Sequence, residues 1–279
     1  MLQLSANIEF MFRDREFVDR IDAVAELGLS ALEFGPDPEA TSGEVDMSTI
    51  AERVTRNNLV VANISVQPRL RLLDGDQIDA LSQSVRHSCL LARQMRCSLL
   101  GLLVEEVKWT PGQPWYEYQR DQKQRDLRCR QRDNIVRAVK TVAPIAEGEG
   151  MTLVMECLNT LVDHADYYLA SWREGVSIVR EVDSPAVALT FDAYHHQINE
   201  GNLINSLTQD IDLIRHIHIA DVPGRHEPGT GEINYLNFLT AAKRAGYEGF
   251  LGLECFPTMS DVSAALAPIR EIVDQVNGA

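Results

Sequence analysis

Apolar residues gather in eight short segments along the chain, and amphipathic stretches lie between them. Short apolar runs separated by helical stretches are typical of strands that alternate with helices. The expected strands are residues 2–8, 30–34, 59–65, 98–104, 152–157, 187–192, 216–221 and 250–255. Eight such units of roughly 35 residues each match a (β/α)8 barrel. The sequence therefore predicts the α/β class, with a single TIM barrel domain over residues 1–279.

The stretch between the first two expected strands shows the helical pattern most clearly. Phe17, Ile21, Val24 and Leu27 recur at helical spacing, and Gly28 follows as a C-terminal cap. A doubly wound sheet is disfavoured, since it usually has fewer strands and no glycine fingerprint follows the first strand here.

The last four expected strands each combine a bulky apolar face with one polar side chain on the opposite face. In residues 152–157, Leu153 and Met155 share one face while Glu156 lies on the other. The apolar face packs under the helices of a barrel, so the polar side chain points inward. The same alternation predicts an inward, strand-end position for Glu156, Asp192, His218 and Glu254. TIM barrel active sites lie at these carboxyl ends.

Two glutamates, one aspartate and one histidine form a mostly oxygen ligand set. This set suits one divalent cation, Mg²⁺, Mn²⁺ or Co²⁺, with Zn²⁺ also accommodated through the imidazole. Buried carboxylates need a partner. The alternative partner is an Arg or Lys on a neighbouring strand, but none of the four strands carries an inward basic residue. The pattern favours a metal.

Two further residues near the expected barrel mouth suggest substrate contacts. His195 follows the sixth strand and is expected to contact a substrate hydroxyl or carbonyl, the alternative being a helix cap. Arg225 is the strong cation of the glycine-rich segment 221–235, and a guanidinium binds a carboxylate in bidentate fashion. The alternative is a solvent-exposed arginine. Glu227 and Glu232 in this segment would repel a phosphate, which favours a non-phosphorylated substrate.

Other residues carry weaker expectations. Residues 105–134 interrupt the pattern as a loop and then the exposed start of a long helix; Trp109 and Trp115 in that loop are candidates to close over a substrate. Asn7, Glu33 and Asn63 share the inward parity, with Arg a candidate partner for Glu33. His196 is expected to face solvent and His216 to lie in a lower barrel layer, and the cysteines are interpreted as core thiols.

Charge and composition exclude some classes of binding partner for this protein. Lys and Arg number 26 against 41 Asp and Glu, a formal charge of −15, which argues against nucleic acid and anionic membranes. No apolar run approaches the roughly 20 residues that span a bilayer. Five cysteines without a C-x-x-C pair suggest a reducing, cytoplasmic setting. The expected partner is a small-molecule substrate, and a homo-oligomer is left open.

The motifs LVMECLN, FDAYH, HIHIAD, EPGTGEINY and GLEC occur in this order. With them the chain resembles the xylose-isomerase-like TIM barrels, and within these the hydroxypyruvate isomerase family. The resemblance implies a metal-dependent aldose–ketose isomerase that acts through an enediolate. It implies metal ligation by Glu156, Asp192, His218 and Glu254, proton transfer by Glu156 and Glu254, and substrate binding by His195 and Arg225.

Three alternatives stay open. Ketose 3-epimerases share the ligand quartet, and returning a proton to the same carbon from its opposite face gives an epimer. A non-catalytic binding or assembly subunit can use the same barrel. Endonucleases that act at abasic sites also share it, but they need several zinc ions, more strand-end histidines and a basic surface.

Overall fold

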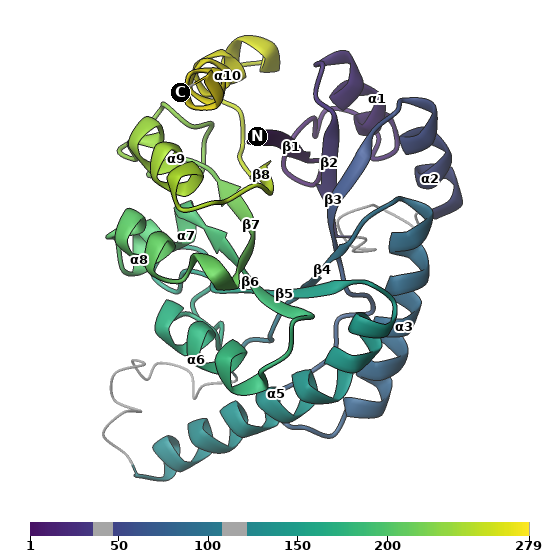
Figure 1. The fold of residues 1–279 in the computed structure, drawn as a ribbon, viewed down its shortest axis with the longest axis vertical. Coiled ribbons are helices and arrows are strands. Elements are labelled where there is room, and N and C mark those ends of the chain that lie inside the picture. The colour runs from purple at the N-terminus through teal and green to yellow at the C-terminus, as the bar shows by residue number, and fades with distance from the viewer. Residues whose placement is uncertain (36–46, 108–121, 279) are drawn as a thin grey trace.

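Eight parallel strands form a closed barrel in the computed structural model, which describes residues 1–35, 47–107 and 122–278. Each strand pairs with the next along the chain, and the last pairs with the first (Figure 1). The strands are β1 (Gln3–Asn7), β2 (Ala31–Phe34), β3 (Val60–Ser65), β4 (Leu99–Leu102), β5 (Thr152–Glu156), β6 (Val187–Asp192), β7 (Ile214–Ile219) and β8 (Phe250–Leu253). All eight overlap the predicted segments, so the TIM barrel is confirmed.

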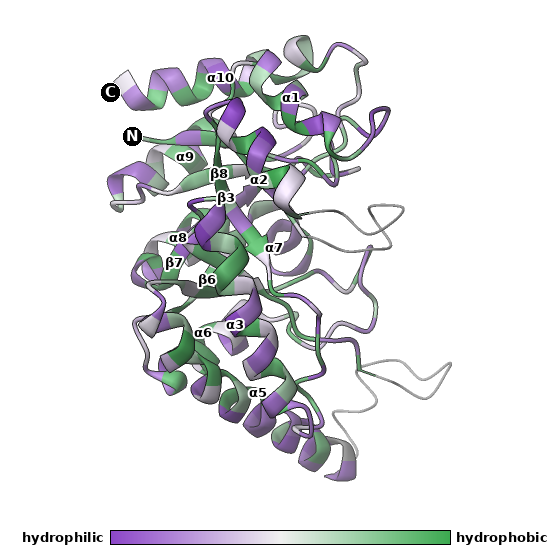
Figure 2. Cartoon of the chain, turned by 90° about the vertical axis from the view of Figure 1, so that its right-hand side faces the viewer, coloured by the Kyte–Doolittle hydropathy of each residue, from purple (hydrophilic) through white to green (hydrophobic). Residues whose placement is uncertain are grey.

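Helices surround the barrel (Figure 1). They are α1 (Asp19–Glu26), α2 (Met47–Arg56), α3 (Ile78–Gln94), α5 (Gln122–Gly148), α6 (Trp172–Val182), α7 (Ala193–Asn199), α8 (Leu203–Gln209), α9 (Tyr235–Arg244) and α10 (Val262–Gly278), with a 3-10 turn at Ile211–Leu213. Ile21 and Val24 of α1 are fully buried, and Gly28 takes the positive φ expected after a helix end. Figure 2 shows hydrophilic and hydrophobic residues alternating along the outer helices, as helices with one packed face require.

The main core lies between the strands and the helices. The bulky apolar residues of the last four strands are buried there, and each contributes about 1.5–3 kcal/mol relative to exposure. They are Leu153, Met155, Val187, Leu189, Phe191, Ile217, Ile219, Leu251 and Leu253. This burial fixes the opposite parity for the polar side chains, so the core determines which residues face the barrel interior.

Residues 105–134 are described in part. Helix α5 begins at Gln122 and its first turns are exposed, which confirms the expected exposed helix start. Trp109 and Trp115 lie outside the described residues. No helix in the described part of the chain is long and apolar enough to cross a membrane.

Two minor expectations were wrong. His196 does not face solvent: α7 turns back over the barrel, and the imidazole packs against Trp172 and Phe191. Cys129 is not a core thiol, because it lies in the exposed first turns of α5, whereas the other four cysteines are buried.

Candidate active site

Four polar side chains meet at the carboxyl ends of the last four strands. Glu156 ends β5, Asp192 ends β6, His218 lies near the end of β7, and Glu254 directly follows β8. One ligand atom from each side chain lies within 4.8 Å of those of the other three. The structure thus brings together the four residues that strand alternation placed inside the barrel. We call them the acidic cluster.

The imidazole of His218 lies at the centre of the acidic cluster. Its Nδ1 is 2.8 Å from Glu156 Oε1, 3.4 Å from Glu254 Oε2 and 3.8 Å from Asp192 Oδ2. All four side chains are buried or nearly so. Three carboxylates that are buried or nearly so therefore surround one ring nitrogen.

Burial has the largest effect on the ionisation of Glu254 in the acidic cluster. Burial, with the charges of Glu156 and Asp192, raises the pKa of Glu254 to about 8, although His218 and Arg225 act in the opposite direction. Burial would lower the pKa of His218, but Glu254, Glu156 and Glu33 hold it well above its usual value. An oxygen-rich set of converging ligands with uncompensated negative charge fits a divalent cation.

Arg225 enters the acidic cluster from the loop after β7, a position that alternation within the strands could not reveal. Its Nη2 donates to Glu254 Oε2 at 2.5 Å, and its Nε donates to the Glu254 carbonyl at 3.3 Å. The guanidinium carbon lies 4.5 Å from the centroid of the Phe10 ring and 5.1 Å from that of Tyr194. Arg225 is 8% exposed, so the solvent-exposed alternative is wrong.

The loop that carries Arg225 is held in place by Asp221. This fully buried carboxylate accepts the backbone N–H groups of Val222 and Ile233 through Oδ1. A side chain at Gly231 would place its Cβ 2.1 Å from the Val222 carbonyl oxygen, so the loop closes only over glycine. These contacts fix the path of the segment between β7 and α9.

The two glutamates of this loop do not face the acidic cluster. Glu227 is buried and accepts the backbone N–H of Thr258, while Glu232 accepts from Gln197 at the surface. The repulsion of a phosphate by these two side chains stays a prediction. The acidic cluster itself supplies the negative charge at the barrel mouth.

His195 lies in the first turn of α7, where Asp192 caps the helix through its Oδ1 and the His195 N–H at 2.9 Å. Asn159 donates its side-chain N–H to His195 Nδ1 at 2.7 Å, so the hydrogen-bond pattern assigns the ring proton to Nε2. Burial lowers the pKa of this imidazole to about 4. Nε2 has no hydrogen-bond partner among the described residues and lies 3.7 Å from Asp192 Oδ2. A neutral N–H donor thus stands beside the acidic cluster.

Other polar residues of the barrel support the acidic cluster. Asn7, predicted to point inward from β1, donates to Glu254 Oε1 at 3.1 Å. Glu33 on β2 is buried, but its partners are His216 and His218 instead of an arginine. His216 lies in a lower layer of the barrel interior, as predicted. Asn159 was missed, because its role depends on the path of the loop after β5.

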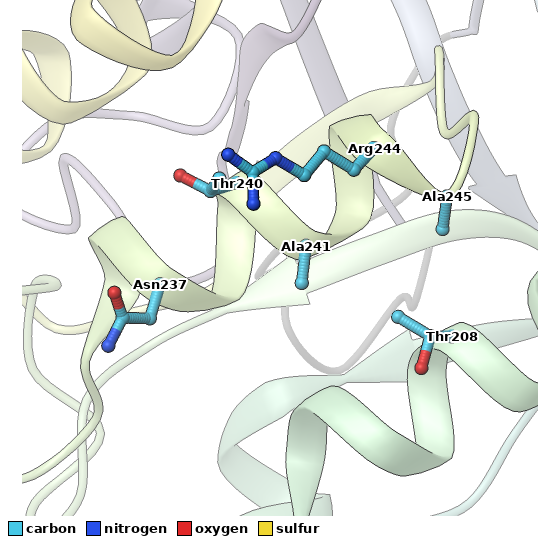
Figure 3. A pocket seen from close by; sticks show the side chains of 6 residues that line it. All are labelled: Thr208, Asn237, Thr240, Ala241, Arg244 and Ala245. Atoms are coloured by element: carbon cyan, nitrogen blue, oxygen red, sulfur yellow. The ribbon is translucent and has the colours of Figure 1, made fainter.

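Two hollows differ in their relation to the acidic cluster. A groove of about 550 Å³ lies between α8 and α9 on the outside of the barrel, and Arg244 is the charged residue of its wall (Figure 3). A smaller cavity of about 120 Å³ lies at the carboxyl ends of β2 to β4, where Glu9 and Ser65 are among its lining residues. Asn7 links this cavity to the acidic cluster, because its Oδ1 accepts the Glu9 N–H while its Nδ2 bonds Glu254.

The family model that describes the xylose isomerase-like TIM barrel matches residues 21–272. The chain belongs to this family. A 2-oxo-tetronate isomerase of Cupriavidus necator is 28% identical over 268 residues, which cover 92% of this chain and 94% of that protein. The hydroxypyruvate isomerase of Escherichia coli is 26% identical over 268 residues, with coverage of 92% and 94%. The predicted resemblance to xylose-isomerase-like barrels and hydroxypyruvate isomerases is confirmed.

Solved structures agree on the fold. One described as an AP endonuclease of family 2 from Brucella melitensis has a TM-score of 0.83 at 25% identity and covers 97% of this chain and 99% of its own. A D-allulose 3-epimerase from Methylomonas sp. has a TM-score of 0.75 at 20% identity, with 98% of both chains covered. Enzymes with different names thus share this barrel, and the chemistry must be argued from the site.

Proposed function

We propose that this protein is a metal-dependent aldose–ketose isomerase for a small, non-phosphorylated hydroxy-carbonyl acid. Hydroxypyruvate and 2-oxo-tetronates are the substrate class that the names of its relatives favour. The observation that carries the proposal is the acidic cluster, in which three carboxylates and one imidazole converge at the carboxyl ends of β5 to β8.

The acidic cluster provides both a cation site and proton carriers. Glu156, Asp192, His218 and Glu254 would hold one divalent ion, Mg²⁺, Mn²⁺, Co²⁺ or Zn²⁺, which when bound polarises a carbonyl and acidifies the adjacent C–H. Glu156 and Glu254 come from β5 and β8, on different sides of Asp192 and His218. One glutamate removes the proton from the carbon that carries the hydroxyl, and an enediolate of the substrate forms. The hydroxyl proton passes to the former carbonyl oxygen, and a proton delivered to the former carbonyl carbon completes the isomerisation.

His195 and Arg225 would orient the substrate. His195 presents a neutral Nε2–H without a partner among the described residues, and this donor suits an oxygen that gains negative charge in the enediolate. The guanidinium of Arg225 is held by Phe10, Tyr194 and Glu254, and in this position it would also bind a substrate carboxylate. The negative charge of the acidic cluster disfavours a phosphate.

A ketose 3-epimerase is the second candidate, favoured by the histidine at position 218, which the ligand set of this chain shares with the epimerases. The reaction then ends with the proton on the same carbon. The two outcomes differ in the product formed and in the carbon that carries solvent deuterium.

The test is a turnover screen with hydroxypyruvate, 2-oxo-tetronates and free ketoses, each with Mg²⁺, Mn²⁺ or Co²⁺ in deuterium oxide. The proposal expects an isomerised acid that carries deuterium at the new C–H. Epimerised ketose without isomerised acid would establish the second candidate. Absence of turnover under all conditions would support a binding or assembly subunit, and cleavage of a duplex containing an abasic site would support an endonuclease. Asp192→Ala serves as the inactive control.

A further inference from the structure

A second polar layer crosses the barrel interior beneath the acidic cluster. The Glu33 carboxylate contacts two histidines of β7, with Oε2 2.6 Å from His216 Nε2 and Oε1 3.3 Å from His218 Nε2. Glu33 and His216 are at most 1% exposed. Strands β2 and β7 are not neighbours, because β8 and β1 lie between them. The carboxylate therefore reaches across two strands to meet these rings.

Small residues on β1 and β8 leave room for the Glu33 side chain to extend to β7. Ser5 on β1 donates its hydroxyl to Glu33 Oε2 at 3.3 Å. On β8, a Cβ at Gly252 would lie 2.1 Å from Glu33 Oε1 and 2.7 Å from His218 Cδ2. Real Cβ atoms do not approach other heavy atoms so closely, so any side chain at position 252 would displace the carboxylate or the imidazole.

The two nitrogens of His218 face different surroundings. Nδ1 points to the carboxylates of Glu156 and Glu254, whereas Nε2 points to Glu33. A histidine ligates a cation through a nitrogen that carries no proton, and the other ring N–H commonly meets a carboxylate that fixes the tautomer. Nδ1 is hydrogen-bonded to Glu156 Oε1 at 2.8 Å. Nε2 and Glu33 Oε1 face each other at 3.3 Å, and neither has a hydrogen-bond partner among the described residues. A cation bound at Nδ1 would leave the proton on Nε2, with Glu33 as its acceptor.

A second cation site formed by Glu33, His216 and His218 is the competing interpretation, since their ligand atoms also lie within 4.8 Å of one another. The direct contact of 2.6 Å with His216 and the Ser5 hydroxyl already satisfy Oε2 of the Glu33 carboxylate, and Oε1 faces the Nε2 of His218. The geometry favours a hydrogen-bonded layer over a second ion.

We propose that Glu33 is a positioning residue, which holds the proton of His218 on Nε2 and thereby directs Nδ1 to the metal in the acidic cluster. His216 fixes the orientation of the Glu33 carboxylate, and Gly252 provides the space in which it reaches His218. This proposal rests on the proposed cation site at the acidic cluster. It assigns a function to a glutamate that lies one layer below the reacting groups.

The first test measures Mn²⁺ affinity by calorimetry for the wild type and for Glu33→Gln, which keeps the shape of the side chain but removes its charge. We expect one ion per wild-type chain and binding that is about 10- to 100-fold weaker in the variant. The matched control is Glu105→Gln. Glu105 is also buried, but it accepts the N–H groups of Leu72 and Leu73 and does not touch His218. The control should retain wild-type affinity.

Melting temperatures separate positioning from general stability. Bound Mn²⁺ raises the melting temperature by an amount that depends on affinity. Glu33→Gln should reduce this metal-dependent increase. Glu105→Gln should lower the melting temperatures of the metal-free and metal-loaded forms by similar amounts. Gly252→Ala provides a second route to the same effect, because it removes no polar group and acts through displacement of the carboxylate.

The tautomer of His218 can be measured directly in the wild-type protein. Long-range proton–nitrogen correlation spectra of the Zn²⁺-loaded wild type should show His218 with its proton on Nε2, assigned by loss of the signal in His218→Gln. A proton on Nδ1, two ions per chain, or unchanged affinity in both Glu33→Gln and Gly252→Ala would overturn the proposal. Wild-type protein that binds no ion would instead contradict the proposed function.

Discussion

Glu33 and Glu254 are both buried glutamates at the barrel interior, yet their surroundings shift their ionisation in opposite directions. Burial would raise the pKa of Glu33, but His216 and His218 outweigh it and hold this pKa below the usual range. Burial also raises the pKa of Glu254, and the carboxylates of Glu156 and Asp192 help to carry it to about 8. The positively charged groups near Glu33 outweigh the effect of its burial. Those near Glu254 do not, because they also face the carboxylates of Glu156 and Asp192.

The difference separates a carboxylate that would position another side chain from one that would bind a cation. A buried charge is tolerated when it is paired and hydrogen-bonded. Glu33 meets this condition at Oε2 through His216 and Ser5, and its Oε1 lies 3.3 Å from His218 Nε2. Glu254 has Arg225 and His218, but these two cations also serve Glu156 and Asp192. The acidic cluster therefore has a remaining need for positive charge, which a divalent cation would meet.

Removal of the metal should give the largest effect. Because the acidic cluster would act on the substrate only with a cation, dialysis against a chelator should abolish isomerisation, and Mg²⁺, Mn²⁺ or Co²⁺ should restore it. Initial rates before and after addition of each ion measure this. If elemental analysis shows that the protein is metal-free and it is still fully active, the claim that the acidic cluster needs a divalent cation is contradicted.

The next largest effect concerns the proton carriers. Glu156→Gln and Glu254→Gln keep the shape of the side chain and remove the base. Each change should lower kcat at least about a hundredfold, the usual scale for a positioned acid or base. Steady-state kinetics and solvent deuterium in the product provide the readout. If both variants keep the metal and near-normal turnover, a hydride shift between carbons becomes the better mechanism.

A smaller effect is expected at the guanidinium. Arg225→Lys keeps the charge but loses the planar fork, so KM for an acid substrate should rise about tenfold, in keeping with about 1.5–3 kcal/mol for a charged hydrogen bond. KM for a neutral ketose should change less. An equal KM for the acid in wild type and variant would show that Arg225 serves Glu254 and not the substrate.

The smallest effect is the pH dependence of stability in the metal-free protein. Since the folded-state pKa of Glu254 is raised, its contribution to stability is complete below about pH 4.5 and is lost as the pH rises through about 8. Wild type should therefore lose several degrees of melting temperature relative to Glu254→Gln between pH 5 and 8. If the difference in melting temperature between wild type and Glu254→Gln stays constant from pH 5 to 8, Glu254 does not have a raised pKa in the folded protein. For Glu33 the sign is reversed, because its stabilisation is lost as the pH falls below about 4.5.

The sequence revealed the parts of this site that depend on strand alternation. Strict alternation with fully buried residues such as Leu153 and Phe191 requires Glu156 and Asp192 to face inward. The same rule identified Glu33 as inward, but it could not show that its carboxylate crosses to β7. That contact depends on barrel closure and on the absence of a side chain at Gly252.

Loop-borne contacts were harder to predict because they depend on three-dimensional paths. Arg225 was recognised as a cation near the mouth, but its pairing with Glu254 follows from a loop that Asp221 holds closed. Asn159 beside His195 gave no signal in the strand pattern. The same limit explains His196, whose burial results from the way α7 packs on β6.

The central claim is that the acidic cluster holds one divalent cation, and Mn²⁺ titration of the wild type and Asp192→Ala tests it most directly. Asp192 ends β6 and lies 3.8 Å from His218 Nδ1, so its removal takes one ligand from the acidic cluster without opening the outer core. The account predicts one tightly bound ion per wild-type chain and none in the variant, with unchanged circular dichroism. Full occupancy in Asp192→Ala would contradict it.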